Sequence, residues 1–239
     1  MTFILFYFIK FYCLKRLVMI KWIYLIGKGM KKMIAVIDYG AGNLQSVVKA
    51  LEFIGCKHII TSSTKELLKA DGAILPGVGS FGDAMDCMVS SGCAQAVVEF
   101  VKSGKPLLGI CLGLQLLFEA SEESPGVKGL GLLKGTISRI PNADGALKIP
   151  HMGWNSLNIV KHDGIFEGIK DEPYVYFVHS YYLRAEDSSI VSSRTEYGVS
   201  IDASVSCKNI HAAQFHPEKS GAVGLQMLRN FAAMTQRGE

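Results

Sequence analysis

The sequence predicts an α/β fold in which a mostly parallel central sheet is flanked by helices and joined by an additional antiparallel section. Before Gly126, short apolar runs alternate with stretches of helical spacing, which is the pattern of consecutive strand–helix units. After Gly126, short strand-like runs follow one another with turn residues between them, and helical spacing returns only over 223–234. Since no internal repeat or low-complexity linker interrupts this order, we expect residues 33–239 to form one domain.

Local signals place the individual elements. Asn43 is a favourable N-cap residue before a helical pattern, and Gly55 follows that pattern as a typical stop. On such signals, helices are predicted over 44–54, 83–91, 94–102, 112–120 and 223–234. Strands are predicted over 34–37, 58–61, 73–75, 106–110, 137–140, 174–179, 181–184, 190–195, 204–207 and 210–215.

Charge and cysteine content exclude several classes of protein. The formal net charge is +4, but residues 1–32 hold seven basic and no acidic residues, so the remainder has 18 basic against 21 acidic residues. A basic surface for nucleic acid is therefore not expected on the main domain. The six cysteines include no C-x-x-C pair, so we expect neither a zinc site nor a disulfide framework, and this usage is typical of the reducing cytoplasm.

Residues 1–32 form a hydrophobic and basic N-terminal extension. Lysine and arginine residues interrupt its apolar runs, so none approaches the roughly 18 residues needed to span a bilayer. An amphipathic anchor at a membrane surface is one alternative. Translated upstream sequence or an unpacked extension is favoured over it, because Met33 opens what reads as the first core strand. We expect no firm membrane association.

The stretch around Cys111 has the form of a nucleophile elbow. A buried strand and a helix meet at Cys111, and the pattern Gly109-x-Cys111-x-Gly113 supplies the small residues that such a sharp turn requires. At a helix N-terminus the thiol would feel the positive end of the dipole, and the free amide of Leu112 could stabilise an oxyanion. The alternative is that Cys111 packs as a small buried hydrophobe, which is the commoner fate of a free cysteine.

A base and an orienting group follow near the C-terminus. An apolar strand stops at Pro217, so His216 is presented at a strand end, and Glu218 lies two residues further on, near enough to bond the imidazole. A nucleophilic cysteine needs both groups close in space, so this pair favours a catalytic role for Cys111.

These residues resemble the Cys-His-Glu triad of the class I glutamine amidotransferases. The resemblance rests on Gly109-Ile-Cys111-Leu-Gly113-Leu-Gln115 and Gln214-Phe-His216-Pro-Glu218. Four further stretches, which begin at Ile37, Leu75, Pro150 and Tyr176, are similar to the glutaminase subunits of imidazole glycerol phosphate synthases. The likeness runs from about residue 33 to the C-terminus, and it implies a flavodoxin-like class I amidotransferase fold.

The resemblance also implies roles for particular residues. The catalytic residues would be Cys111, His216 and Glu218, and the oxyanion amides those of Leu112 and of Val78 or Gly79. The glutamine-binding residues would be Gly77, Gln115, His179, Ser180 and Tyr181. The residues at a partner interface would be Asn43, Trp154, Tyr176 and Lys219. No cofactor and no metal are implied.

The implied activity is hydrolysis of L-glutamine to glutamate and ammonia in the cytoplasm, as part of histidine biosynthesis. A cyclase subunit of (β/α)8-barrel type would form a heterodimer with the chain and use the ammonia to make imidazole glycerol phosphate and aminoimidazole carboxamide ribotide. Two alternatives stay open: the glutaminase of another class I amidotransferase, and a homologue that binds a partner without catalysis.

Overall fold

The computed structural model describes residues 32–40, 43–142, 145 and 147–236, and in them an eight-stranded sheet forms the centre. Its order is β2-β1-β3-β4-β13-β12-β11-β8. The five strands from β2 to β13 are parallel, and β12, β11 and β8 continue the sheet in antiparallel pairing. The strands are β1 (Ile34–Ile37), β2 (His58–Thr61), β3 (Gly72–Gly77), β4 (Leu107–Cys111), β8 (Asn158–Ile159), β11 (Val191–Glu196), β12 (Ser200–Cys207) and β13 (Ile210–Ala213). The predicted mostly parallel sheet with an antiparallel section is confirmed.

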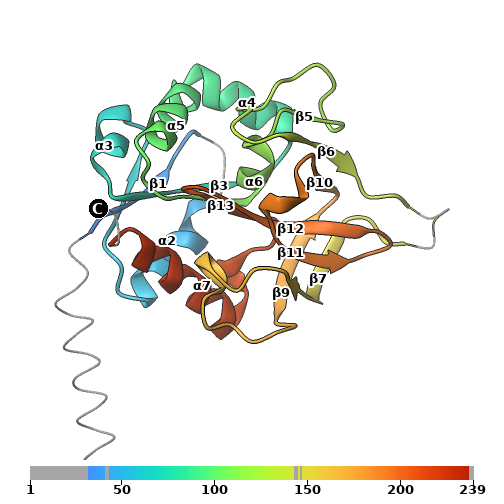
Figure 1. Ribbon diagram of the computed structural model, residues 1–239. Helices are drawn as coiled ribbons and strands as arrows, with labels where there is room; N and C mark the ends of the chain where they lie inside the picture. Colours follow the sequence, from blue (N-terminus) through green and yellow to red (C-terminus); the bar gives the residue numbers. More distant parts are fainter. Residues whose placement is uncertain (1–31, 41–42, 143–144, 146, 237–239) are drawn as a thin grey trace, which may run out of the picture. The chain divides into compact units, whose positions relative to one another are not determined.

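Helices cover both faces of the parallel strands. In Figure 1, α3, α4 and α5 lie on one side of the sheet and α2 and α7 on the other. The helices are α2 (Leu44–Phe53), α3 (Thr64–Lys69), α4 (Phe81–Ser90), α5 (Cys93–Lys102), α6 (Leu112–Leu116) and α7 (Gly221–Met234). Coverage from both sides explains why β1, β3, β4 and β13 are buried at every position and read as continuous small or apolar runs.

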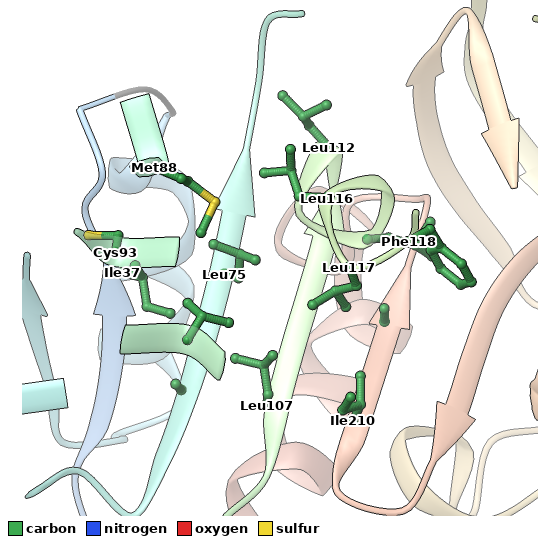
Figure 2. Packing of buried hydrophobic residues seen from close by; sticks show 14 of the residues in the cluster. Ile37, Leu75, Met88, Cys93, Leu107, Leu112, Leu116, Leu117, Phe118 and Ile210 are labelled. Carbon is green, nitrogen blue, oxygen red and sulfur yellow. The ribbon is translucent and has the colours of Figure 1, made fainter. Parts of the chain in front are cut away.

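The core beneath α4 and α5 fixes the strand that leads to Cys111. Figure 2 shows Ile37 of β1 and Leu75 of β3 close to Met88 of α4, with Leu107 further toward the start of β4 in the same packed layer. All four side chains are at most 1% exposed. Burying each such side chain contributes about 1.5–3 kcal/mol, so this layer stabilises the packing of the helices against the strands that lead to the site.

Two smaller sheets are separate from the central sheet. The first has the order β10-β6-β5, with β10 (Tyr181–Ala185), β6 (Gly135–Arg139) and β5 (Ala120–Ser121). The second is the antiparallel pair β7 (His151–Ser156) and β9 (Tyr174–His179). The described residues also form short 3-10 helices: η2 (Gly164–Phe166), η3 (Ser188–Ile190) and η4 (Pro217–Lys219).

The structure differs from the sequence prediction at several elements. The helix predicted over 112–120 ends at Leu116, because the next residues turn to pair with β6 through β5. Helix α3 and strand β7 were not predicted, since α3 has only six residues and β7 contains Gly153 and few β-branched residues. Asn43 is the N-cap of α2, but its side chain makes no capping hydrogen bond.

The predicted N-terminal extension lies outside the described residues, apart from Lys32. The boundary at residue 33 therefore stays a prediction. Across the described ranges, none of the helices combines the length and the apolar character needed to cross a bilayer.

Candidate active site

Cys111 occupies a strained elbow between β4 and α6. Its backbone has φ 55° and ψ −111°, a left-handed φ that costs a non-glycine residue free energy of order 1–3 kcal/mol. The flanking glycines permit the turn, because a Cβ on Gly109 would lie 2.8 Å from the Gly113 carbonyl oxygen and one on Gly113 would lie 1.9 Å from the Leu75 carbonyl oxygen. The predicted elbow is confirmed in geometry, and Cys111, the last residue of β4, borders a cavity.

The Cys111 thiol lies among polar groups. It is 7% exposed, and its Sγ lies 3.9 Å from the carbonyl oxygen of Val178. The side-chain amide Nε2 of Gln214 donates to Sγ at 3.6 Å. This thiol therefore faces a hydrogen-bond donor and a cavity, unlike a cysteine that packs as a small hydrophobe.

His216 and Glu218 form a buried pair beside the elbow. His216 Nδ1 lies 2.8 Å from Glu218 Oε1, and the two side chains are 4% and 3% exposed. The His216 amide donates to the Tyr176 carbonyl oxygen at 2.9 Å, which anchors the residue to β9. With Nδ1 committed to Glu218, His216 Nε2 is the free nitrogen, and within the described residues it has no hydrogen-bond partner.

The surroundings of His216 make it basic. Burial lowers the pKa of His216, but the interactions with Cys111 and Glu218 outweigh burial and raise it to about 9. An imidazole of this kind can take a proton from the neighbouring thiol and hold it as a cation that Glu218 stabilises.

One cavity of about 360 Å³ joins most of the predicted site residues. It is lined by Val78, Gly79, Cys111, Leu112, Gln115, Glu123, Pro150, Val178, His179, Ser180, Tyr181, His216 and Lys219. All the predicted oxyanion residues and all the predicted glutamine-binding residues except Gly77 are in this set. The volume suits a small polar molecule.

Gly77 lies instead at a second, smaller cavity. That cavity has about 10 Å³ and also contacts Asn43, Lys219 and His216. A Cβ on Gly77 would lie 2.8 Å from the Tyr39 hydroxyl and 2.9 Å from the Gly113 amide nitrogen. The geometry therefore requires glycine there for close packing, and its contact with a substrate stays a prediction.

Gln115 is fixed by two hydrogen bonds from one amide group. Its Nε2 donates to the Tyr181 carbonyl oxygen at 3.1 Å and to Gln214 Oε1 at 3.0 Å. Gln214 in turn donates to Cys111, so a continuous chain joins the cavity wall to the thiol. Gln214 stands in the sequence motif around His216, but the motif alone predicts no role for it. The feature of the sequence that could have indicated a role is that Gln214 is polar within an otherwise apolar run. In the structure the Gln214 side chain is 0% exposed.

The predicted interface residues fall into two pairs. Trp154 of β7 and Tyr176 of β9 are cross-strand partners whose ring centroids are 6.2 Å apart with an interplanar angle of 73°. Trp154 is 55% exposed, which is unusual for so large an apolar side chain. Asn43 and Lys219 both line the smaller cavity next to His216. Their role in binding a partner stays a prediction.

Comparison with known proteins gives consistent matches over most of the chain. The family model for glutamine amidotransferase class-I matches residues 35–234. The imidazole glycerol phosphate synthase subunit HisH of Bacillus cereus (strain G9842) is 48% identical over 204 residues, which is 85% of this chain and 96% of the relative. The subunit of the same name from Methanothermobacter thermautotrophicus is 52% identical over 199 residues, or 83% of this chain and 97% of the relative. A solved glutamine amidotransferase covers 84% of this chain and 98% of its own at 21% identity with a TM-score of 0.67, and this likeness supports the fold.

Proposed function

The chain belongs to the class I glutamine amidotransferase family, and from that premise we propose that it is the glutaminase subunit of an imidazole glycerol phosphate synthase. In this role it hydrolyses L-glutamine to L-glutamate and ammonia for histidine biosynthesis. The observation that carries the proposal is the meeting of Cys111, at a strained elbow, with the buried His216–Glu218 pair at one cavity. We place the reaction in the cytoplasm.

The first half of the reaction forms a thioester. His216 Nε2 takes the thiol proton, and Cys111 Sγ attacks the carbon of the glutamine side-chain amide. The tetrahedral intermediate collapses when His216 returns the proton to the amide nitrogen, so the C–N bond breaks and ammonia leaves. Glu218 holds the imidazole in the tautomer that this exchange needs and stabilises its cation. Water then adds to the thioester with His216 as base, which releases glutamate and restores the thiol.

The oxyanion of the intermediate needs donors that point into the cavity. Leu112 is the first residue of α6, so its amide has no partner in the preceding turn, and it lies directly after the nucleophile. Val78 and Gly79 border the same cavity and supply the second amide in our proposal. Loss of one such donor typically costs about 3 kcal/mol of transition-state stabilisation.

The substrate is held by groups around the same cavity. Gln115 uses both amide protons within the protein, which leaves its Oε1 to accept from the ammonium group of glutamine. His179, Ser180 and Tyr181 border the same cavity, and in our proposal the backbone of Ser180 and Tyr181 helps to bind the substrate.

The ammonia would serve a second subunit. We propose a cyclase of (β/α)8-barrel type that forms a heterodimer with this chain and docks on Asn43, Trp154, Tyr176 and Lys219. Trp and Tyr are the residues that most often anchor a buried interface, and Trp154 presents such an anchor at the surface. Asn43 and Lys219 lie at the smaller cavity behind His216, so a partner bound there would sit close to the site where ammonia forms.

The test replaces the nucleophile and supplies ammonia directly. Cys111→Ala should abolish glutamine-dependent synthesis by the complex with the cyclase, while ammonium salts still support synthesis. Cys207→Ala is the matched control, because Cys207 pairs with Ile210 at the opposite end of β13 from His216, and it should retain both activities. Loss of both activities in Cys111→Ala would show that Cys111 is structural. If the wild-type chain released ammonia from glutamine but supported synthesis by no cyclase, it would more closely fit the glutaminase of another class I amidotransferase.

A further inference from the structure

Two buried histidines link strand β7 to the wall of the substrate cavity. His151 Nδ1 lies 3.0 Å from His179 Nε2, and His179 Nδ1 lies 2.9 Å from the carbonyl oxygen of Tyr181. The two histidines are direct cross-strand partners in the β7–β9 pair, and they are 3% and 6% exposed. His151 does not line the cavity, but its hydrogen bond joins it to His179, which does.

The hydrogen bonds determine which nitrogen carries each proton. A carbonyl oxygen only accepts, so His179 must donate to Tyr181 from Nδ1. A neutral His179 then has an unprotonated Nε2, which can only accept, and His151 must donate to it from Nδ1. Both rings therefore carry their proton on Nδ1, and His151 Nε2 is left as an acceptor.

The hydrogen bonds at His151 Nε2, the end of this series away from the cavity, fit this arrangement. The amide nitrogen Nδ2 of Asn155 lies 3.4 Å from His151 Nε2 and donates to the Glu196 carbonyl oxygen at 3.0 Å. The orientation of that amide is fixed because Asn155 Oδ1 accepts from the Ser156 backbone at 2.9 Å. A donor thus faces His151 Nε2, which disfavours a proton on that nitrogen.

Packing holds the pair in the neutral state. His151 stacks between Phe177 and Tyr197, with ring centroids 4.7 Å and 3.9 Å away. Burial lowers the pKa of His151 to about 4 and that of His179 to about 3, so neither ring is charged near neutral pH. Neutral rings keep the donor and acceptor order described above.

At its other end, this series of hydrogen bonds reaches the proposed substrate-binding groups. The Tyr181 carbonyl oxygen accepts from His179 and also from Gln115 Nε2, and Gln115 is connected through Gln214 to the Cys111 thiol. A change in the direction of this carbonyl would move Gln115 and the backbone of Tyr181, both of which border the cavity.

We propose that His151 is a positioning residue for glutamine binding, which fixes the tautomer and orientation of His179 and thereby the Tyr181 carbonyl and Gln115. This inference deepens the proposed function and rests on it for the identity of the substrate. The proposal requires that His151 is neutral and donates a hydrogen bond from its Nδ1.

Two substitutions distinguish the effect of the Nδ1 donor from the effect of the aromatic ring. His151→Phe keeps an aromatic ring between Phe177 and Tyr197 but removes the donor, whereas His151→Asn keeps an N–H donor near the Nδ1 position but removes the ring. In complex with the cyclase, His151→Phe should raise the KM for glutamine about tenfold with kcat changed less than about threefold, since one hydrogen bond to a binding group is lost. His151→Asn should keep KM within about threefold of the wild-type value, because the donor is restored. Equal KM values for His151→Phe and the wild type, or a larger defect in His151→Asn, would overturn the proposal.

Nitrogen NMR of the imidazoles tests the same proposal without an activity measurement. In the wild-type chain labelled with ¹⁵N-histidine, both His151 and His179 should carry the proton on Nδ1, and His179 should lose this fixed state in His151→Phe. A proton on Nε2 of either ring in the wild type would overturn the proposal even if every variant failed to fold. If the wild-type complex showed no glutaminase activity while the tautomers were as expected, the proposed function would fail and the positioning of Tyr181 would stand.

Discussion

His216 is subject to opposing influences, and their balance sets its chemistry. Burial disfavours the imidazolium, whereas Cys111 and Glu218 favour it, and the result is a pKa raised to about 9. Pro217 lies between His216 and Glu218 and begins η4, so its restricted φ helps to hold the base and its orienting group close together. The pair is therefore preorganised, and little further ordering is needed when substrate binds.

At the residue scale, Glu218→Gln should lower the glutaminase kcat about a hundredfold, the typical worth of a well-placed acid–base group, while leaving the protein folded. Removing the negative charge removes one of the causes that raise the pKa of His216, so the acidic limb of the pH–rate profile, where His216 loses its proton and becomes able to act as base, should move to lower pH. Steady-state kinetics across pH and thermal unfolding measure both effects. Glu52→Gln removes the same charge from an exposed position of α2 and should change neither. A collapse of thermal stability in Glu218→Gln would assign Glu218 to a structural network instead.

The buried pair His151 and His179 predicts a pH dependence of stability. Burial lowers both pKa values below the roughly 6.5 of an unfolded histidine, so the unfolded chain binds these protons first as the pH falls. The contribution of the pair to stability is therefore complete above about pH 6.5 and is lost as the pH falls toward 4. Urea unfolding between pH 7 and 4.5 should show a smaller loss in His151→Phe, which has one such group fewer. An identical pH dependence in the two proteins would contradict this account.

At the element scale, the site depends on the close approach of α6 to β3. Gly113 of α6 packs so tightly that a Cβ there would lie 1.9 Å from the Leu75 carbonyl oxygen, and the obstacle is backbone. The same contact places the α6 N-terminus beside Gly77 at the end of β3. Packing thus brings the start of α6 next to Gly77, the last residue of β3, from which the chain continues into Val78 and Gly79.

Gly113→Ala should therefore destabilise the protein by about 3 kcal/mol or more, because the main chain of β3 or α6 must shift to admit one methyl group. Gly82→Ala in α4 is the matched control. Its added Cβ would lie 2.8 Å from the Ser124 hydroxyl oxygen and 3.2 Å from Ser124 Cβ, so Ser124 must turn and lose the hydrogen bond that it accepts from the Gly82 amide, but the obstacle is a side chain. One such hydrogen bond is worth about 1 kcal/mol. We expect the control to change stability by less than about 1 kcal/mol, since alanine also favours the helix. Equal urea midpoints for the two variants would show that the β3–α6 contact is not required.

The elements differ in how far the sequence predicts them. Strands β1, β3, β4 and β13 are predicted well because both faces are buried and their composition is accordingly small and apolar. Cys111, His216 and Glu218 are predicted as site residues because each stands in a local motif. Strand β7 could not be predicted, because its pairing with β9 depends on distant chain and its own residues carry no alternation. The His151–His179 contact joins residues 28 apart in the chain, and such contacts leave no local pattern.

At the scale of the whole site, one loop borders both cavities. Val78 lines the large cavity with Cys111 and the small one with Asn43, and it is 41% exposed. Gly79 has φ +99°, a conformation that a residue with a side chain rarely adopts. His216 and Lys219 also border both cavities. A partner that contacts Asn43 and Lys219 would therefore act directly on the loop that carries the proposed oxyanion amides.

This arrangement predicts that the isolated chain hydrolyses glutamine slowly and that a bound cyclase, especially with its own substrate loaded, accelerates it by about a hundredfold or more. Gly79 makes a peptide rotation in the loop sterically cheap, so the oxyanion site can be completed when the partner binds. A hundredfold change needs only about 2.7 kcal/mol, close to the worth of one well-aimed amide donor. Steady-state kinetics of the chain alone and in complex measure the effect.

Trp154→Ala should weaken activation at a fixed cyclase concentration, whereas Val89→Ala, which removes a similarly exposed apolar side chain from α4, should not. Equal rates with and without the cyclase would refute the coupling and leave the roles of Cys111, His216 and Glu218 in hydrolysis unaffected.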